Sequence, residues 1–194
     1  LCNSKEISLA VKSINPDFVM HLAAESHVDR SISRPKDFLN SNILGTFNLL
    51  ESVREHYQNL TISRKKNFRF HHVSTDEVFG SIRLGAKFSE KSPYNPQSPY
   101  SATKAASDHL VRAWQATYGF PITISNCSNN YGPWQQPDKL IPLIIYRSIR
   151  NQTIPIYGSG ENIRDWIFVE DHVNAILNIA FKASEGSTYC VGGC

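Results

Sequence analysis

The sequence lacks the features of membrane-spanning, disulfide-rich and nucleic-acid-binding proteins. No apolar run in the 194 residues approaches the roughly 20 that a membrane-spanning helix needs, and residues 1–6 lack the pattern of an export signal. The four cysteines have neither CxxC spacing nor the density of a disulfide scaffold, which indicates reduced thiols and no metal site. The net charge of +3 is too small to indicate a nucleic-acid partner. We therefore expect a cytoplasmic protein without membrane or nucleic-acid partners.

The sequence does contain short apolar runs that alternate with helix-length segments. The runs predict buried strands over 17–23, 68–74 and 121–126. Apolar residues at steps of three and four predict helices over 35–57 and 100–118, with Gly119 as a C-cap. One apolar stripe is expected in each helix: Leu39, Ile43, Phe47, Leu50, Val53 and Tyr57 in the first, and Ala102, Ala106, Leu110, Ala113 and Trp114 in the second. This alternation predicts βαβ units, an α/β fold and a parallel sheet.

The pattern changes after residue 126, where a turn-rich loop replaces the regular alternation. A helix is predicted near 140–150, followed by a short edge strand over 154–157, because Pro155 cannot donate a hydrogen bond to a central strand. A last amphipathic helix is predicted over 170–183, with Val173, Ile176, Leu177 and Ala180 on its buried side. The segment is expected to form a smaller lobe.

Candidate catalytic residues follow the second strand and open the next helix. Thr75, Asp76 and Glu77 supply a hydroxyl and two carboxyl groups at a strand end, where ligands bind in open α/β sheets. Two adjacent carboxyls can act as acid and base if their surroundings separate their pKa values. Tyr100 and Lys104 are four residues apart on one helix face, so the ammonium is expected to lower the pKa of the phenol.

Each pattern alone also has a structural interpretation. Asp76 and Glu77 could cap a turn, and Tyr100 and Lys104 could be an exposed pair on a helix. The functional interpretation is favoured because LAAES, STDE and YxxxK follow one another in order, each at a predicted sheet end.

The sequence resembles the extended short-chain dehydrogenase/reductase family, and within it the nucleotide-sugar 4,6-dehydratases. The resemblance covers residues 14–193 and rests on six stretches: HLAAESHVDRS (21–31), VSTDEVFG (73–80), SPYSATKAASDHLVRAW (98–114), SNNYGP (128–133), DKLIPL (138–143) and PIYGSGENIRDW (155–166). It implies a Rossmann-like, doubly wound parallel sheet, incomplete at the N-terminus, in a partial NAD-binding domain over 1–127. A smaller mixed α/β substrate lobe is expected over 128–194, of which 165–183 returns to pack on the first domain.

The resemblance also implies a reaction. A nucleotide-activated glucose, dTDP-glucose, is expected to be dehydrated to the 4-keto-6-deoxy sugar with transient hydride transfer to NAD. Tyr100, helped by Lys104 and Thr75, is expected to take the proton of the C4 hydroxyl. Glu77 is expected to take the C5 proton, and Asp76 to protonate the departing C6 hydroxyl.

Binding residues follow from the same matching. The residues expected near the cofactor are Leu22, Ala23, Ala24, Glu25, Ser26, Ser41, Tyr100, Lys104 and Asn130. The residues expected near the nucleotide sugar are Ser26, Thr75, Asn129, Lys139, Leu140, Pro155, Ile156, Tyr157 and Arg164. Arg164 suits a diphosphate because a guanidinium binds two oxygens at once, although a surface salt bridge is the alternative. The predicted helices 36–57 and 100–118 resemble those through which family members form homodimers.

The sequence contains no glycine-rich turn between a strand and a helix, the element that receives a dinucleotide pyrophosphate. It begins with Leu1 and ends at Cys194 without a closing element, from which we expect a fragment of a longer protein. We expect the 194 residues alone to bind NAD poorly and to be inactive. Calorimetric titration that shows micromolar NAD binding to this chain would contradict that expectation.

Three alternative functions stay open at the level of sequence. UDP-glucose 4,6-dehydratases also carry the TDE motif, whereas nucleotide-sugar epimerases and decarboxylases keep YxxxK but do not need both carboxyls. A non-catalytic binding protein of the same fold is expected to lose Tyr100, Lys104 or Glu77, and all three are present.

Overall fold

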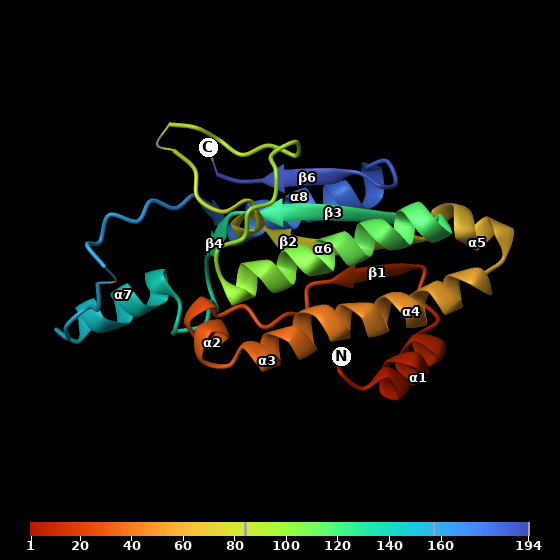
Figure 1. The fold of residues 1–194 in the computed structure, drawn as a ribbon, viewed down its shortest axis with the longest axis horizontal. Helices are drawn as coiled ribbons and strands as arrows, with labels where there is room; N and C mark the ends of the chain where they lie inside the picture. The colour runs from red at the N-terminus through yellow and green to blue at the C-terminus, as the bar shows by residue number, and fades with distance from the viewer. Residues whose placement is uncertain (84, 157, 194) are drawn as a thin grey trace.

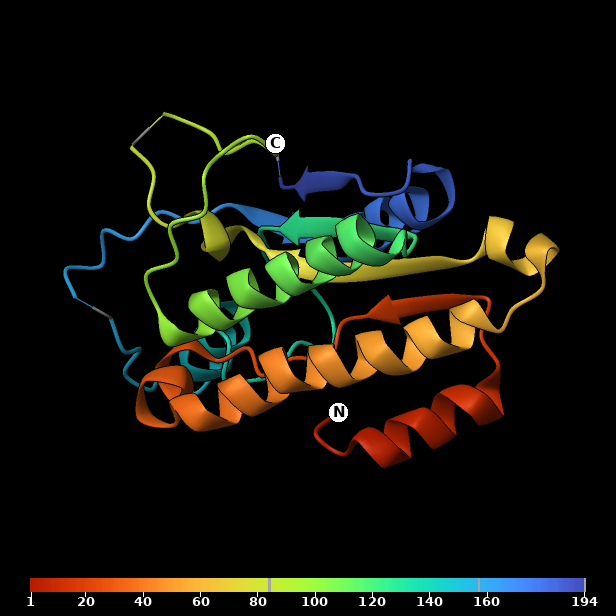
Figure 2. The same ribbon diagram turned by 45° about the vertical axis from the view of Figure 1, so that its right-hand side comes forward.

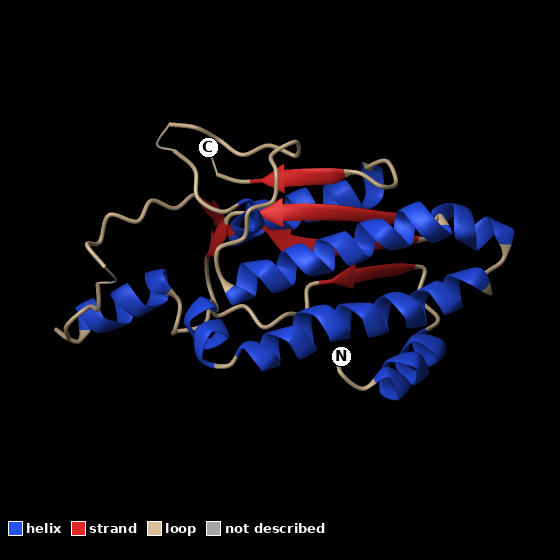
Figure 3. Cartoon of the chain, in the orientation of Figure 1, coloured by secondary structure: helices blue, strands red, loops and turns tan. Residues whose placement is uncertain are grey.

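A four-stranded parallel sheet with helices on both faces organises the chain, as the computed structural model of residues 1–83, 85–156 and 158–193 shows (Figure 1; Figure 3). The strands are β1 (Phe18–His21), β2 (Arg69–Thr75), β3 (Ile122–Cys127), β4 (Asn129–Tyr131), β5 (Trp166–Phe168) and β6 (Thr188–Val191). The α-helices are α1 (Ser4–Ile14), α2 (Val28–Ser33), α3 (Pro35–Phe38), α4 (Gly45–Gln58), α5 (Ile62–Asn67), α6 (Pro99–Tyr118), α7 (Leu140–Ile149) and α8 (Val169–Lys182). A π-helical segment, η1 (Leu39–Leu44), joins α3 to α4, and a 3₁₀ turn, η2 (Asp76–Phe79), follows β2.

The strand order β1-β2-β3-β6 brings the carboxyl ends of the strands to one edge of the sheet. Every neighbouring pair is parallel, and the register places Thr75 beside Cys127 at the ends of β2 and β3. Strands joined by helical crossovers pair in this way because the crossover returns the chain to the starting edge. The predicted α/β fold with a parallel sheet is confirmed.

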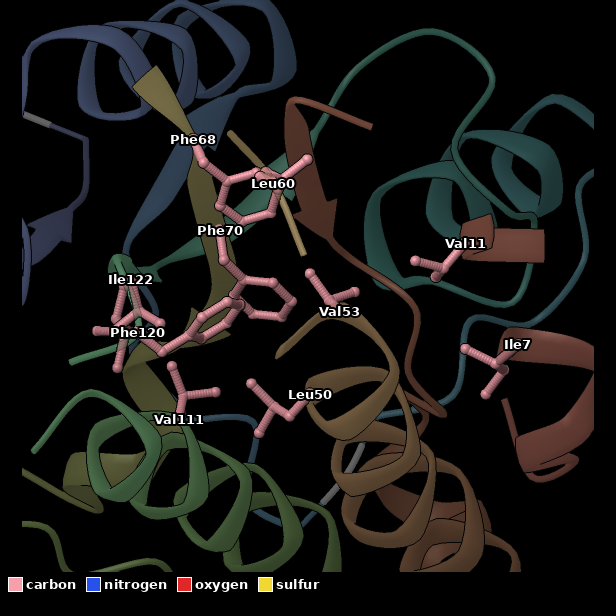
Figure 4. Close-up of a cluster of buried hydrophobic side chains, with 11 residues drawn as sticks. Ile7, Val11, Leu50, Val53, Leu60, Phe68, Phe70, Val111, Phe120 and Ile122 are labelled. Atoms are coloured by element: carbon pink, nitrogen blue, oxygen red, sulfur yellow. The ribbon is translucent and has the colours of Figure 1, made fainter. Parts of the chain in front are cut away.

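The main hydrophobic core lies between the sheet and the layer formed by α1, α4 and α6 (Figure 4). Phe68 and Phe70 of β2 meet Phe120, and Leu50 of α4 and Val111 of α6 close the cluster. All five side chains are fully buried, and each such side chain contributes about 1.5–3 kcal/mol of transfer free energy. This core fixes α6 on the sheet, and α6 carries half of the candidate active site.

Helix α8 covers the opposite face of the sheet (Figure 2). Ile176 and Ala180 are buried as predicted, but Val173 is 47% exposed and Leu177 is 42% exposed. His172 lies on the buried side instead. The predicted stripe was therefore wrong at Val173 and Leu177. These two residues lie one turn apart on the flank of the helix, beside the buried face that contains His172 and Ile176.

The predicted helix 35–57 is interrupted by the π-helical segment η1. A π-helical turn holds more residues than an α-helical turn, so side chains after it point in a new direction. Leu50 and Val53 are buried as expected, whereas Leu39 and Phe47 are exposed. The single continuous apolar stripe predicted from periodicity is therefore wrong at those two positions.

Helix α6 turns a polar face to the sheet. It begins one residue before the prediction and ends at Gly119, whose φ of 62° confirms the predicted C-cap. Ala102 and Ala113 of the predicted stripe are exposed, while Lys104 and Asp108 are buried. Leu110 and Trp114 of the stripe are half-buried against the main core, so the predicted stripe lies along the flank of the helix, and the face that carries Lys104 and Asp108 is identified only by the tertiary contacts.

The predicted edge strand over 154–157 is wrong for residues 154–156, and Tyr157 lies outside the described residues. The chain leaving α7 is held locally instead, because the Arg147 carbonyl accepts from the Gln152 N–H and the Arg147 guanidinium donates to the Thr153 carbonyl. Sequence analysis missed the parallel pair of β4 and β5 and the strand β6. No helix in the described ranges combines the length and apolarity that crossing a bilayer requires.

Candidate active site

The candidate active site lies where β1, β2 and β3 end and α6 begins. Ser98 is the N-cap of α6, and its hydroxyl accepts a hydrogen bond from the Ser101 N–H at 3.0 Å. The Ser101 hydroxyl in turn accepts from the Ser98 N–H at 2.9 Å. This reciprocal cap fixes the first turn of α6 and therefore places Tyr100 beside the end of β2.

Lys104 is held one turn farther along α6. Its side chain is buried with only 4% of the residue exposed, and its ammonium donates to the Val73 carbonyl of β2 at 2.9 Å. The ring of Tyr100 meets Phe38 edge to face, with centroids 6.3 Å apart. The structure therefore brings the predicted tyrosine and lysine to the strand end that carries Thr75.

The pKa of Tyr100 departs from the sequence-based expectation. Burial and the negative charge of Glu77 raise this pKa above the ordinary value of a phenol, and Asp76 adds to the effect while Thr75 opposes it. The Lys104 ammonium donates to a backbone carbonyl rather than to the phenol. The prediction that the Lys104 ammonium lowers the pKa of Tyr100 is therefore wrong, and the raised pKa means that the phenol keeps its proton at neutral pH.

The acidic pair is positioned by the tight turn that follows β2. The Thr75 hydroxyl accepts from the Glu77 N–H at 3.3 Å and lies 3.4 Å from a carboxylate oxygen of Asp76, to which it donates. Gly80 ends the turn with a φ of 81°, and a Cβ at that position would collide with the backbone oxygen of Asn95. The VFG sequence thus lets the chain turn sharply after the two carboxyls.

The two carboxyls have different electrostatic surroundings. Burial, followed by the charge of Glu77, raises the pKa of Asp76 to about 6. Burial also raises the pKa of Glu77, but the positive charges of Arg164 and Lys139 oppose the shift. The raised pKa of Asp76 therefore favours its protonated form, which suits a proton donor, and the positive charges near Glu77 favour its ionised form, which suits a base.

This difference predicts a pH dependence for any step in which Asp76 donates a proton. Asp76 must be protonated to act, and its protonated fraction falls about tenfold for each pH unit above its pKa. In single-turnover measurements on the complete gene product, we expect C6–O cleavage to slow at alkaline pH, with a midpoint no lower than about 6. The alkaline limb should be absent from the residual rate of Asp76→Asn. An elimination rate that stays constant between pH 6 and pH 9 would contradict the role of Asp76.

The loop after β1 is held by a residue that sequence analysis missed. The Asn42 side chain accepts from the Glu25 N–H at 2.8 Å and donates to the Glu25 carbonyl at 3.0 Å. It also donates to the Thr103 hydroxyl of α6 at 2.9 Å. Asn42 therefore joins the predicted cofactor loop 22–26 to the helix that carries Tyr100, and Ser41 precedes it in η1. The only sequence signal is a polar residue inside an apolar helical pattern.

Asn130 lies on β4, just after the end of β3. Its amide donates to the Ser128 carbonyl at 3.1 Å, and its oxygen is 2.8 Å from Nδ1 of His172 on α8. The neighbouring Asn129 N–H donates to the Asp165 carbonyl at 3.2 Å where β4 meets β5. His172 was not predicted as a site residue. The predicted buried stripe of α8 included Val173 instead of His172, so no signal in the sequence indicated that His172 faces inward.

The predicted substrate residues are only partly brought together. The Lys139 ammonium donates to the Ser26 carbonyl at 3.4 Å, and its charge and that of exposed Arg164 act on Glu77. Leu140 begins α7 and is exposed. Within the described ranges, no hydrogen bond or ion pair joins Pro155 or Ile156 to the catalytic candidates. No group of three or more His, Cys, Asp or Glu side chains in those ranges forms a candidate metal site.

Comparison with known families gives a match over almost the entire chain. The family model described as GDP-mannose 4,6 dehydratase matches residues 1–193. The chain belongs to the GDP-mannose 4,6 dehydratase family. This result confirms the resemblance inferred from the sequence motifs.

Individual relatives are similar to this protein over the whole of its chain. The chain is 52% identical over 193 residues to the probable dTDP-glucose 4,6-dehydratase of Sinorhizobium fredii (strain NBRC 101917 / NGR234), covering 100% of this chain and 55% of that protein. It is 51% identical over 202 residues to the dTDP-glucose 4,6-dehydratase of Escherichia coli, covering 100% of this chain and 56% of that protein. A crystal structure of the dTDP-glucose 4,6-dehydratase of Streptomyces venezuelae with NAD and TYD bound has a TM-score of 0.89 and 40% identity, covering 99% of this chain and 56% of that chain. The chain spans just over half the length of these relatives.

Proposed function

We propose that this chain carries the catalytic residues of an NAD-dependent nucleotide-sugar 4,6-dehydratase, a hydro-lyase, with dTDP-glucose as its substrate. The observation that carries the proposal is the placement of the Asp76 and Glu77 carboxyls beside Tyr100 and Lys104 at one sheet edge. Similarity to dTDP-glucose 4,6-dehydratases over the whole chain supports the choice of substrate.

The chain's own residues divide the proton transfers among them. Tyr100 accepts the proton of the C4 hydroxyl in its phenolate form, which the positive charge of bound NAD would favour over the phenol, and Thr75 lies beside it. A keto group at C4 makes the C5 proton acidic, and Glu77 removes that proton as the base. Asp76 then gives its proton to the C6 hydroxyl, which leaves as water.

The described residues fit a nicotinamide dinucleotide at the ends of β1 and β2. Lys104 donates one hydrogen bond to Val73, which leaves two of the three N–H groups of the ammonium for hydroxyl oxygens of a ligand. Leu22 exposes an apolar side chain where β1 ends, and Asn42 fixes the loop after it. NAD, when bound, would supply a hydride acceptor for C4, a positively charged ring and, after water is lost, the hydride that is returned to C6. We propose that residues 22–26, Ser41, Tyr100, Lys104 and Asn130 hold it.

On the sugar-nucleotide side we propose that positive charge and backbone contacts hold the substrate. Arg164 and Lys139 supply the charge for the diphosphate, and both already act on Glu77. The remaining proposed contacts are Ser26, Thr75, Asn129, Leu140, Pro155, Ile156 and Tyr157, the last of which lies outside the described residues.

The test is an assay of the complete gene product with dTDP-glucose and UDP-glucose side by side, with NAD present. Formation of the 4-keto-6-deoxy sugar from dTDP-glucose at a higher kcat/KM supports the proposal. Preference for UDP-glucose would instead assign the alternative substrate. Inversion at C4 without loss of water would assign an epimerase and reject the dehydratase.

We propose in addition a cytoplasmic homodimer in which α4 and α6 of two copies meet. Exposed apolar side chains occur along η1, α4 and α6, among them Leu39, Leu44, Phe47 and Tyr118. Helices that pair through four-helix contacts need such an outer apolar face. Sedimentation of the complete gene product as a monomer at micromolar concentration would reject the dimer.

We also propose a division of the chain between cofactor and substrate, with residues 1–127 in the NAD-binding part and 128–194 in the substrate lobe. The packing of α8 against β2 and β3 supports the return of residues 165–183 to the first part.

A further inference from the structure

Behind the candidate active site lies a cluster of buried polar side chains centred on Asp108, which the proposed reaction does not use. Asp108 belongs to α6 and is 0% exposed. Its Oδ2 accepts from the Ser74 hydroxyl at 2.9 Å, from the Tyr94 hydroxyl at 2.7 Å and from the Asn126 amide at 3.2 Å. Its Oδ1 is 3.1 Å from Nε2 of His72. The carboxylate thus joins α6 to β2, to β3 and to the loop that precedes α6.

The surroundings of Asp108 keep it ionised. Burial by itself would raise the pKa of this carboxyl, but the hydrogen bond from His72 and the positive charge of Lys104 outweigh burial and lower it. The Tyr94 hydroxyl, which also accepts from the Arg112 guanidinium at 2.7 Å, acts in the same direction. A buried carboxylate with several donors is stable as the charged form.

The negative charge of Asp108 can stabilise the positive charge of Lys104. Lys104 lies one helical turn before Asp108 on the same face of α6. The two side chains do not form a contact ion pair in the described structure. Burial lowers the pKa of Lys104, and the charge of Asp108 is the larger of two influences that raise it, the other being Cys127. His21 of β1 and His72 of β2 also face Lys104, and burial lowers the pKa of both so that they are neutral at neutral pH.

The same cluster reaches the strand end that carries the acidic pair. The Asn126 amide, which donates to Asp108, also donates to the Thr75 carbonyl at 3.1 Å. Ser74, the residue before Thr75, donates directly to Asp108. A change at Asp108 is therefore transmitted to both halves of the candidate site.

We propose that Asp108 is a positioning residue for the candidate active site: its carboxylate balances the buried charge of Lys104 and ties the end of β2 to α6. The activity readout of this inference rests on the proposed function. Its stability readout does not, because the charge balance exists with or without a substrate.

The stability test is a double-mutant cycle in the complete gene product, with Asp108→Asn, Lys104→Met and the combination of the two. Removing one partner leaves an uncompensated buried charge, whereas removing both leaves none. We expect the double variant to unfold at a higher temperature than Asp108→Asn alone. If Asp108→Asn does not fold, recovery of folding in the double variant supports the proposal. The proposal would be overturned if the losses of stability in the two single variants simply add in the double variant. It would also be overturned if neither Asp108→Asn nor the double variant folds.

The activity test follows oxidation at C4 in single turnovers as a function of pH, because this step uses Tyr100 and Lys104 and not Asp76. Lys104 must be protonated for this step, and loss of the Asp108 charge lowers the pKa of Lys104. The alkaline limb, the decline of the rate at high pH, should therefore move to lower pH by about one unit or more in Asp108→Asn. At a pH above that limb the rate should fall about tenfold or more, with the KM for dTDP-glucose unchanged. Tyr94→Phe removes the hydrogen bonds of the Tyr94 hydroxyl, including the one it donates to Asp108, but keeps the charge of Asp108, so the pH above which its rate falls should not change.

A purely structural role for Asp108 predicts a different result. In that case Asp108→Asn lowers the rate equally at every pH, or Tyr94→Phe shifts the limb as much as Asp108→Asn does, and either outcome rejects the proposal. An inactive wild-type enzyme rejects the proposed function, while the stability cycle still decides the role of Asp108.

Discussion

Tyr100→Phe in the complete gene product is expected to lower kcat for dTDP-glucose by about 10² to 10⁴-fold, the range typical for removal of a general acid–base group. The substitution removes only the hydroxyl that exchanges the C4 proton. The phenylalanine ring keeps the edge-to-face contact with Phe38, so α6 should keep its position. Sugar binding, measured as the Kd of dTDP-glucose by titration calorimetry, should change little because the loss falls on proton transfer.

The matched control for this variant is Tyr118→Phe at the other end of α6. Tyr118 is exposed and lies under the guanidinium of Arg54, far along the helix from the strand ends. Its replacement should leave kcat within about twofold, in keeping with the small effects of surface substitutions. A Tyr100→Phe enzyme that keeps more than about a tenth of the wild-type kcat would reject Tyr100 as the group that takes the C4 proton.

Glu77→Gln is expected to stop removal of the C5 proton while leaving sugar binding largely intact. The amide is nearly the same shape as the carboxyl but is not a base, so dehydration should slow by about 10² to 10⁴-fold. The Glu77 N–H that bonds to Thr75 belongs to the backbone and is kept, so the turn after β2 should be preserved. The measurement is incorporation of solvent deuterium at C5 of the sugar, followed by NMR.

Glu55→Gln is the corresponding control, because Glu55 lies on α4 in an exposed ion pair with Lys12. It should incorporate deuterium at the wild-type rate. Incorporation at the wild-type rate in Glu77→Gln would show that another group is the base, and Asp76 would be the next candidate because it adjoins Glu77 in η2.

The regular elements were predictable because their signals are local. The apolar runs predicted β1, β2 and β3 to within about two residues at either end, and Gly119 correctly marked the end of α6. The segment 154–156 was predicted as a strand and is not one, because a strand requires a partner that the local sequence does not specify. The short strands β4, β5 and β6 were missed for the same reason.

The candidate site was predictable in its chemistry but not in its supporting contacts. Thr75, Asp76, Glu77, Tyr100 and Lys104 follow from motifs at strand ends, and the structure brings these five together. The network that holds them was not visible in the sequence. Asn42 contacts Thr103 across 61 residues of chain, and Asp108 contacts Ser74 across 34.

The direction of a pKa also required the tertiary structure. Spacing placed a cation near Tyr100 and predicted a lowered pKa, but spacing carries no information on burial or on the carboxyls of another element. Burial and Glu77 raise the pKa of Tyr100, and the charges of Arg164 and Lys139 oppose, at Glu77 only, the rise that burial causes at both carboxyls.

The sequence by itself determined the alternation of strands and helices, the parallel sheet and the identity of the five catalytic candidates, because these depend on local periodicity and on short motifs. The tertiary structure alone decided which face of α6 meets the sheet, which residues of α8 are buried and how Asp108 is paired. Those outcomes depend on contacts between segments distant in the chain, where burial of a charge is tolerated only if another element supplies its partners.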